Sequence, residues 1–413
     1  MKLDNIKEWF DDNKDKLMLY VIILFVLGII ALTVIYSSNL FDKPPFFSMS
    51  IGTQGTGPGQ LMNPIGVTTD ADGNIYVVDS YNNRIQKFDP KGKLITLWGQ
   101  EGADKSQFNT PCRICIYNNS YIFVTDTKNN RIQVFDIKGK FIKYIGTEGF
   151  GSGEFHQPIG IKINKNNEVA VADTFNNRIQ IFTVNGEFIR TFGEYGSGIS
   201  QLNNPWDMAV DINNNYYVVD TNNHRMQKYD NNGNFMISFG YYGNKDGQFN
   251  YPTAIHVDPK GYIYILDSNN SRVQKFENNG KFIYSWGKRG ITGSSFNQPM
   301  GFFIDDNKNT FIADTRNNRI LKFIKMKTLI NFNKEEPDLL KTVPYSSEYQ
   351  EITPQDIYSS PAPDEFKSGK KPSLDSSIQK PQEYSVTPEE TNKIDSTDTQ
   401  EHDNGNQDDN NEY

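Results

Sequence analysis

A stretch of ten residues recurs six times in this chain, each copy 47 residues after the one before, with no insertion or deletion between copies. Every copy begins with aspartate, carries arginine five residues later and ends on phenylalanine or tyrosine. The copies are residues 79–88, 126–135, 173–182, 220–229, 267–276 and 314–323. A fixed period of this length is typical of a repeat architecture, in which each unit packs on its neighbours.

The residues of one unit predict four antiparallel strands. Residues 158–163, 168–173, 178–182 and 187–193 are short runs rich in Val, Ile, Ala and Phe, separated by turns that contain Asn or Asn-Gly. The second run is almost continuously apolar in several units, which is typical of a strand buried on both faces. Four strands per unit of this length indicate a blade of a β-propeller.

The ends of the repeat region predict six blades. Glycine ends the fourth strand at residues 99, 146, 193, 240 and 287, and Gly52 is the sixth position in phase. The last unit has only three strands, so residues 46–51 are expected to supply its fourth and close the ring. Closure would remove the exposed sheet edges of an open solenoid. We therefore expect an all-β, six-bladed propeller.

The repeated pattern Pro-x-Gly-Ile, Asp-Thr-x-Asn-Asn-Arg-Ile-Gln-x-Phe and Asn-Gly-x-Phe-Ile resembles the NHL repeat family over residues 46 to 325. The resemblance implies a recognition platform that binds a protein, peptide, RNA or glycan on one face. Relatives include membrane-anchored sensor ectodomains, ubiquitin ligases and an amidating lyase. Two cysteines cannot supply a RING finger, so a ubiquitin ligase is rejected. The alternatives are a propeller enzyme of the lyase or lactonase kind and a structural cell-envelope protein.

Five segments follow from composition. Residues 1–16 are a short cytoplasmic segment, 17–36 a transmembrane helix, 37–45 a linker, 46–327 the propeller and 328–413 an acidic disordered tail. Residues 17–36 are uncharged and nearly all apolar, enough to span a bilayer core of about 30 Å. Four lysines precede the run and only Lys43 follows it closely, which predicts a single-pass protein with its propeller and tail outside the cytoplasm.

Charge is concentrated in the tail. Asp and Glu number 6 against 5 Lys and Arg in residues 1–45, 25 against 29 in residues 46–325, and 19 against 8 in residues 326–413. The net charges are therefore −1, +4 and −11, which sum to the −8 of the whole chain. A charge of +4 over the propeller is a weak basic footprint, which disfavours nucleic acid as a partner.

Residues repeated in all blades are expected to hold the blades together. Each aspartate ends a second strand, where it can accept hydrogen bonds from the following turn, and can form an ion pair with the arginine five residues later. The structural residues are Asp79, Asp126, Asp173, Asp220, Asp267, Asp314, Arg84, Arg131, Arg178, Arg225, Arg272 and Arg319.

Residues that differ between blades are the candidates for binding. In a propeller the loops before each first strand and the turns after each second strand share one face, and the second residue after each blade-opening proline lies near the channel mouth. Aromatic side chains mixed with a few charges of both signs favour a protein, peptide or glycan ligand. The candidate ligand-binding residues are Arg113, Lys128, Trp206, Tyr242, Asp207, Phe175, Tyr81 and Arg316.

Other motifs point to structure rather than chemistry. The turn at residues 70–74 resembles the start of a calcium loop but lacks the acidic residue that completes one. Cys112 and Cys115 are three residues apart on a predicted strand, about 10 Å and beyond disulfide reach. His156, His224 and His256 occupy different phases of the repeat. We expect no metal, no cofactor and no catalytic residues, and a monomeric propeller.

Overall fold

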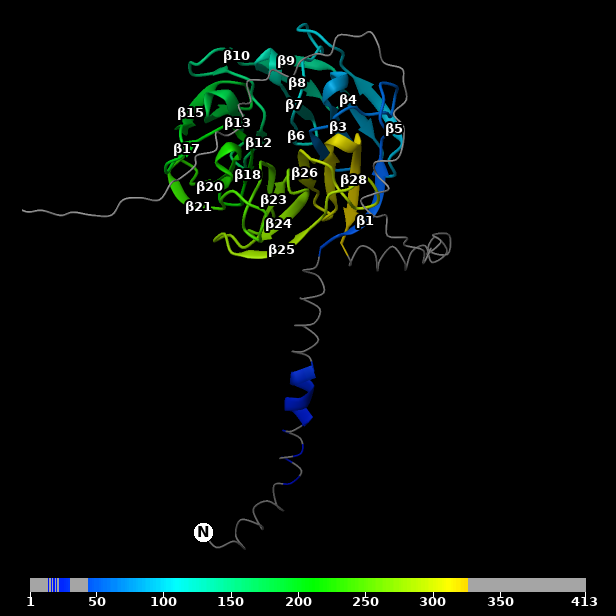
Figure 1. Cartoon of the computed structure of the whole chain (residues 1–413), viewed down its shortest axis with the longest axis vertical. Helices are drawn as coiled ribbons and strands as arrows, with labels where there is room; N and C mark the ends of the chain where they lie inside the picture. The colour runs from blue at the N-terminus through cyan, green and yellow to red at the C-terminus, as the bar shows by residue number, and fades with distance from the viewer. Residues whose placement is uncertain are drawn as a thin grey trace, which may run out of the picture. The chain divides into compact units, whose positions relative to one another are not determined.

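The computed structural model describes residues 44–325 and the helical residues 14, 16, 18, 20 and 22–29. Within residues 44–325 the strands form six four-stranded sheets around a common centre, together with two short pairs of strands (Figure 1). The all-β, six-bladed propeller predicted from the repeat is confirmed.

The blades follow one another in chain order, each running from its innermost to its outermost strand. Blade 1 is β2 (Val67–Thr69), β3 (Ile75–Asp79), β4 (Arg84–Phe88) and β5 (Leu94–Trp98). Blade 2 is β6 (Ile114–Tyr117), β7 (Tyr121–Asp126), β8 (Arg131–Asp136) and β9 (Phe141–Ile145). Blade 3 is β12 (Ile161–Ile163), β13 (Glu168–Asp173), β14 (Arg178–Thr183) and β15 (Phe188–Phe192).

The second half of the ring repeats this order. Blade 4 is β18 (Pro205–Val210), β19 (Tyr216–Asp220), β20 (Arg225–Tyr229) and β21 (Phe235–Phe239). Blade 5 is β22 (Pro252–Val257), β23 (Ile263–Asp267), β24 (Arg272–Phe276) and β25 (Phe282–Trp286). Blade 6 is β26 (Gly301–Ile304), β27 (Thr310–Asp314), β28 (Arg319–Ile324) and β1 (Phe46–Ile51).

The ring closes through its two ends, as the sequence predicts. Strand β1 pairs antiparallel with β28, from Phe46 opposite Ile324 to Ile51 opposite Ile320 (Figure 1). The side chain of Asn318 also accepts a hydrogen bond from the backbone of Asn63 at 2.8 Å, which links blade 6 to the loop before blade 1. The N-terminal strand therefore supplies the outer edge of the last blade.

The core lies between the blades. Side chains on both faces of each second strand are buried, as in β3, because every sheet has a neighbour on each side. The buried apolar residues form one cluster at each of the six junctions between neighbouring blades. Burial of one Val, Leu, Ile or Phe side chain stabilises the fold by about 1.5–3 kcal/mol. The ring is thus held by six equivalent contacts rather than by one central core.

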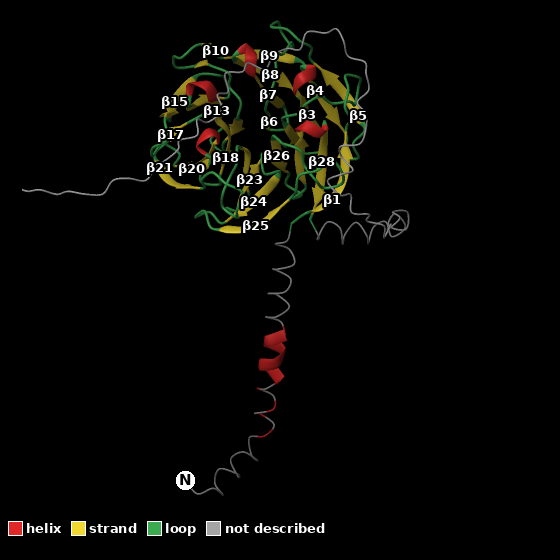
Figure 2. Cartoon of the chain, viewed as in Figure 1, coloured by secondary structure: helices red, strands yellow, loops and turns green. Residues whose placement is uncertain are grey.

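Short helices follow the second strand in five blades. These 3-10 helices are arranged around the ring (Figure 2) and are η1 (Ser80–Asn82), η2 (Thr127–Asn129), η3 (Thr174–Asn176), η4 (Thr221–Asn223) and η5 (Thr315–Asn317). The next residue is left-handed in each case, with φ of 51° at Asn83 and 56° at Asn177. Asparagine tolerates this conformation, which explains the repeated Asn-Asn.

The loops that lead into each blade contain more order than the sequence predicts. Two of them form short parallel pairs, β10 (Thr147–Glu148) with β11 (Glu154–Phe155) and β16 (Glu194–Tyr195) with β17 (Gln201–Leu202). The other four contain a single equivalent bridge. Gly146 at the start of one loop has φ of +78°, and a Cβ there would overlap the ring of Phe155. Glycine recurs at this position because the loop folds back onto the fourth strand.

The segments outside the propeller are described only in part. Most of residues 1–43, and all of the tail from residue 326, lie outside the described residues, so the predicted cytoplasmic segment, linker and tail cannot be compared with the structure. Residues 22–29 are helical, within the predicted transmembrane segment 17–36. Among the residues that are described, no helix is both long and apolar enough to cross a membrane.

Candidate ligand-binding face and central channel

The loops and the short helices meet on one face of the ring, which we name the loop face. The backbone N–H of Tyr81, in η1, donates to the carbonyl of Met62 at 3.2 Å, and the N–H of Lys128, in η2, donates to the carbonyl of Asn109 at 3.0 Å. The opposite face carries the turns between first and second strands and between third and fourth strands. We name it the turn face.

The repeated aspartates organise the loop face. One carboxylate oxygen of Asp79 accepts from the backbone N–H of Met62 at 2.7 Å. The other accepts from the side chains of Asn82, Arg84 and Gln86. The sequence placed the backbone donor in the turn after the aspartate, but it lies in the loop 17 residues before it. The same backbone contact recurs at the other five aspartates.

Each repeated arginine forms an ion pair with its aspartate and also binds the loop. The Nε–Oδ2 distances of the six pairs lie between 2.7 and 2.8 Å. The guanidinium of Arg84 further donates to the carbonyls of Thr56, Gly57 and Gln60. Because a carboxylate and several carbonyls share one guanidinium, these residues fix the loop on its blade and are occupied by structural contacts.

The centre of the loop face is closed by one ion pair across the channel. Nε of Arg113, in blade 2, lies 3.4 Å from Oδ2 of Asp207, in blade 4. Nη2 of Arg113 donates to the carbonyls of Thr253 and Met300 at 2.7 Å each, and Nη1 to that of Ile65 at 3.4 Å. One side chain therefore connects its own blade with residues of four others.

The residues that follow the blade-opening prolines cover this ion pair. Ile65, Cys112 and Ile159 are buried together, with Trp206 and Met300 packed against them, and we name these five residues the channel cap. Arg113 is 6% exposed and Asp207 is 1% exposed. The sequence placed both near the channel mouth as candidate ligand-binding residues. In the structure the two side chains are buried in the channel, where the equivalent positions of the other blades are glycine or alanine.

The other predicted ligand-binding residues lie at the surface of the loop face or in the cap. Tyr81, Lys128, Phe175 and Arg316 are exposed at the turns after the second strands, and Tyr242 is exposed in the loop before blade 5. Trp206 belongs to the channel cap and is partly buried. Arg316 donates to the side chain of Gln298 at 3.1 Å. The predicted ligand-binding residues therefore fall into two groups, one exposed in the loops and turns of the loop face and one buried at the channel.

Exposed apolar side chains gather in the four consecutive loops that lead into blades 3 to 6. We name them the apolar arc, and each is between 64% and 76% exposed. Its residues are Phe150, Tyr195, Ile199, Tyr241, Tyr242 and Ile291. Large exposed apolar side chains that recur on consecutive loops of one face are candidates for contact with a partner. The loops before blades 1 and 2 contribute none of the large exposed apolar side chains of the described residues.

Two histidine rings pack against aromatic residues of the arc. The ring of His156 lies 5.8 Å from that of Phe150 and 5.5 Å from that of Phe175. The ring of His224 lies 5.0 Å from those of Tyr242 and Tyr251, and its Nδ1 accepts from the backbone of Tyr251. Burial lowers the pKa of His224, which favours the neutral imidazole. Such contacts restrict the orientations of these aromatic side chains.

Sequence reasoning missed Phe150, Ile199 and Ile291. Phe150 and Ile291 each follow the second glycine of a Gly-x-x-Gly loop, where other units have Thr, Ala, Ser or Asn. If the six loops are aligned on that glycine, Phe150 and Ile291 stand out as large apolar residues at a position that is otherwise small or polar. Ile199 lies two residues further along its loop, where no comparable signal marks it.

The remaining motifs are structural in the described residues. Asp70 accepts from the backbone of Asp72 and Asn74, which is an Asx-type turn. Cys112 and Cys115 are buried free thiols, and burial raises the pKa of Cys115 to about 12. No group of three or more His, Cys, Asp or Glu side chains suited to a metal ion occurs in the part of the chain that the structure describes.

Comparisons with known proteins agree on the architecture. A family model described as a 6-bladed beta-propeller matches residues 101–191. A model of the NHL repeat matches residues 61–88, 202–229 and 249–276. The E3 ubiquitin-protein ligase TRIM71 of Rattus norvegicus is 50% identical over 44 residues, which are 11% of this chain and 5% of the relative. The match thus spans about a twentieth of that relative's length.

Two solved structures are among those that align with this chain. A structural genomics protein of unknown function from Bacteroides thetaiotaomicron aligns with a TM-score of 0.54 and 14% identity, over 68% of this chain and 73% of that one. Virginiamycin B lyase from Staphylococcus aureus aligns with a TM-score of 0.49 and 15% identity, over 67% of this chain and 98% of that one. At these identities the first similarity concerns the fold alone, and the second carries no further conclusion.

Proposed function

The chain belongs to the NHL-repeat six-bladed β-propellers, and on this basis we propose that it is a recognition protein whose loop face binds a partner. The observation that carries the proposal is the apolar arc, with six large apolar side chains exposed on consecutive loops. The role proposed is binding rather than catalysis.

The chemistry of the arc favours a protein or peptide over a glycan. Ile199 and Ile291 are aliphatic and among the most exposed large apolar side chains of the loop face. Tyrosine and phenylalanine stack on sugars and on peptide side chains alike, whereas exposed isoleucine gains most from apolar side chains of a protein partner. The exposed cations Lys128 and Arg316 lie in the turns after the second strands of blades 2 and 6, and they can contribute polar contacts at the rim.

The closed channel supports a surface interaction instead of an axial one. The channel cap and the Arg113–Asp207 pair occupy the centre of the loop face. A partner would therefore lie across the loops and contact the arc from outside. We leave Arg113 and Asp207 out of the proposed binding surface, because their polar atoms are already engaged within the ring.

Capture of a partner by the full-length protein tests this proposal. We expect the triple variant Phe150→Ser, Tyr242→Ser, Ile291→Ser to bind at least about tenfold more weakly, since central aromatic and aliphatic contacts each contribute more than about 1 kcal/mol. The matched control is Ile95→Ser, Ile142→Ser, Met236→Ser, which removes apolar side chains of 43–52% exposure from the outer strands. Equal capture by the wild type and the triple arc variant would contradict the proposal.

We propose further that the chain is a single-pass membrane protein with the propeller outside the cytoplasm. The support is the uncharged run 17–36 and the lysines before it, Lys2, Lys7, Lys14 and Lys16. The two native cysteines are buried, so an introduced thiol gives a specific label. In intact cells we expect a membrane-impermeant maleimide to label Ser197→Cys but not Asn5→Cys. The reverse pattern, or labelling of Ser197→Cys only after lysis, would contradict this orientation.

A further inference from the structure

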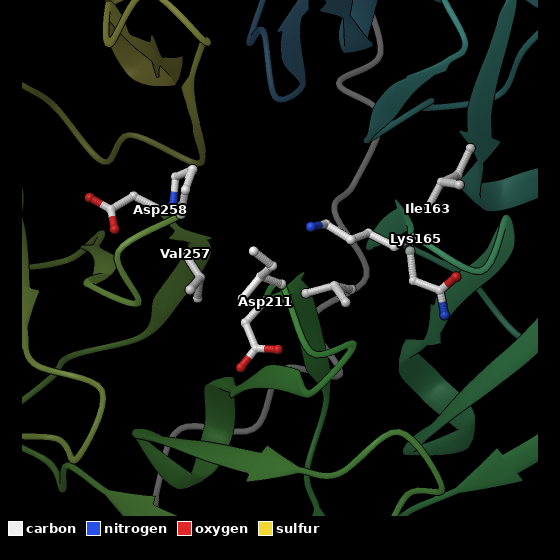
Figure 3. A pocket seen from close by; sticks show the side chains of 9 residues that line it. Ile163, Lys165, Asp211, Val257 and Asp258 are labelled. Carbon is white, nitrogen blue, oxygen red and sulfur yellow. The ribbon is translucent and has the colours of Figure 1, made fainter.

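The channel has a second mouth, on the turn face, and this mouth contains a cavity. The cavity has a volume of about 270 Å³ and lies among the inner strand ends and first turns of blades 3, 4 and 5 (Figure 3). Its apolar wall consists of Ile163, Val210, Ile212, Val257 and Pro259. The volume equals about nine water molecules at ~30 Å³ each, which suits a small organic molecule.

The cavity lies at the opposite end of the channel from the Arg113–Asp207 pair. The inner strands run from the channel cap on the loop face to the cavity on the turn face. On β18 this course leads from Asp207, which pairs with Arg113, to Asp211, which lines the cavity. Four residues of extended chain cover about 13 Å. A ligand in the cavity would thus enter from the turn face, independently of a partner on the loop face.

The acidic residues of the wall are engaged by their own turns. Asp211 accepts from the backbone of Asn213 and Asn215 and from the hydroxyl of Tyr217. Asp258 accepts from the backbone of Lys260 and Tyr262. Both carboxylates point away from the middle of the cavity (Figure 3). These hydrogen bonds hold both carboxylates outside the space in which a ligand would lie.

The cations at the cavity have no such partners. The ammonium of Lys165 points into the cavity (Figure 3). Lys162 lies three residues earlier on the innermost strand of blade 3, β12, and is partly buried. Neither ammonium forms an ion pair or hydrogen bond with any residue that the structure describes. Lys165 lines the cavity, and Lys162, which is not among its lining residues, adds a second positive charge nearby on the same strand end. Two neighbouring lysine charges at a concave site attract an anion.

The pKa of the nearby His256 also responds to the positive charge of Lys162. Burial, together with the charges of Lys162 and Lys308, lowers the pKa of His256 to about 3. His256 is therefore neutral near pH 7 and adds no negative or positive charge.

We propose that this cavity binds a small organic anion, with its acidic group at Lys162 and Lys165 and its apolar part against Ile163, Ile212 and Val257. The acidic group is a carboxylate or a phosphate monoester, because either accepts hydrogen bonds from two ammonium groups. The apolar wall excludes a purely inorganic ion as the best ligand, since such an ion would leave that wall without contacts.

Calorimetric titration of the purified full-length protein with benzoate, phenyl phosphate and inorganic phosphate tests the proposal. We expect saturable binding of benzoate or phenyl phosphate, or of both, and at least tenfold weaker binding of inorganic phosphate. Binding of only one organic probe identifies the acidic group. No saturable binding of either organic probe, or equal affinity for inorganic phosphate, would overturn the proposal.

Two variants and one matched control locate the site. Lys162→Met with Lys165→Met should weaken binding at least tenfold, and Ile212→Trp should do so with both lysines present because it fills the cavity. The control Lys138→Met with Lys140→Met removes the same two charges from an exposed turn of blade 2 and should change the affinity less than twofold. Equal weakening in the control would show non-specific attraction, and unchanged affinity in both site variants would place binding elsewhere.

Discussion

At the scale of the residue, the residues repeated in every blade were correctly predicted to be structural. The residues that differ between blades could not be assigned a role from the repeat alone. The six aspartates and arginines recur in phase, and in the structure each pair forms one ion pair. Arg113 and Asp207 occupy the same phase in blades 2 and 4, where other blades have glycine or alanine. Their contact joins residues 94 apart across the channel, and nothing local in the sequence indicates such a contact.

Removal of Arg113 tests the importance of that contact. We expect Arg113→Met to destabilise the protein by about 3–5 kcal/mol, because it leaves the carboxylate of Asp207 buried without its partner. The double variant Arg113→Met, Asp207→Leu should recover most of this loss, since it removes both charges and keeps apolar volume in the channel. Urea unfolding of the two variants measures the difference, and a double variant no more stable than the single one would contradict it.

At the scale of the element, strand periodicity and turn residues predicted almost every blade strand. The second strands are apolar on both faces because each blade lies between two others. This pattern distinguished a propeller from an antiparallel sheet with one solvent-exposed face. The loops were predicted less well. Their parallel bridges depend on glycines with positive φ and on a phenylalanine or leucine that packs under the loop, such as Phe155. These contacts form only after neighbouring blades meet.

Strand β1 offers a direct test of ring closure. Ile51 is buried between blades 6 and 1, whereas Ser50 on the same strand is exposed. We expect Ile51→Ala to cost about 2–4 kcal/mol, and Ser50→Ala to change stability by less than about 0.5 kcal/mol. Hydrogen exchange of the amides of β28 should accelerate only in the first variant. Equal protection of β28 in both variants would mean that β1 does not hold the last blade.

At the scale of the whole molecule, the two faces of the ring differ in chemistry. The loop face has a closed centre and an apolar arc on one side, while the turn face contains a cavity lined in part by Lys165. The sequence placed binding on the loop face and identified its variable turn residues. It could not distinguish side chains that fill the channel from those that remain outside, because this depends on how six blades share one axis.

Site-specific photocrosslinking in the native setting tests the central claim, that the propeller recognises a partner through the apolar arc. A photoreactive phenylalanine analogue would replace Tyr195 or Tyr242 in the arc, or Ile142 or Met236 on the outer strands. We predict one discrete covalent adduct from each arc position and none from the outer strands. An adduct that forms from the outer strands and not from the arc would contradict the claim.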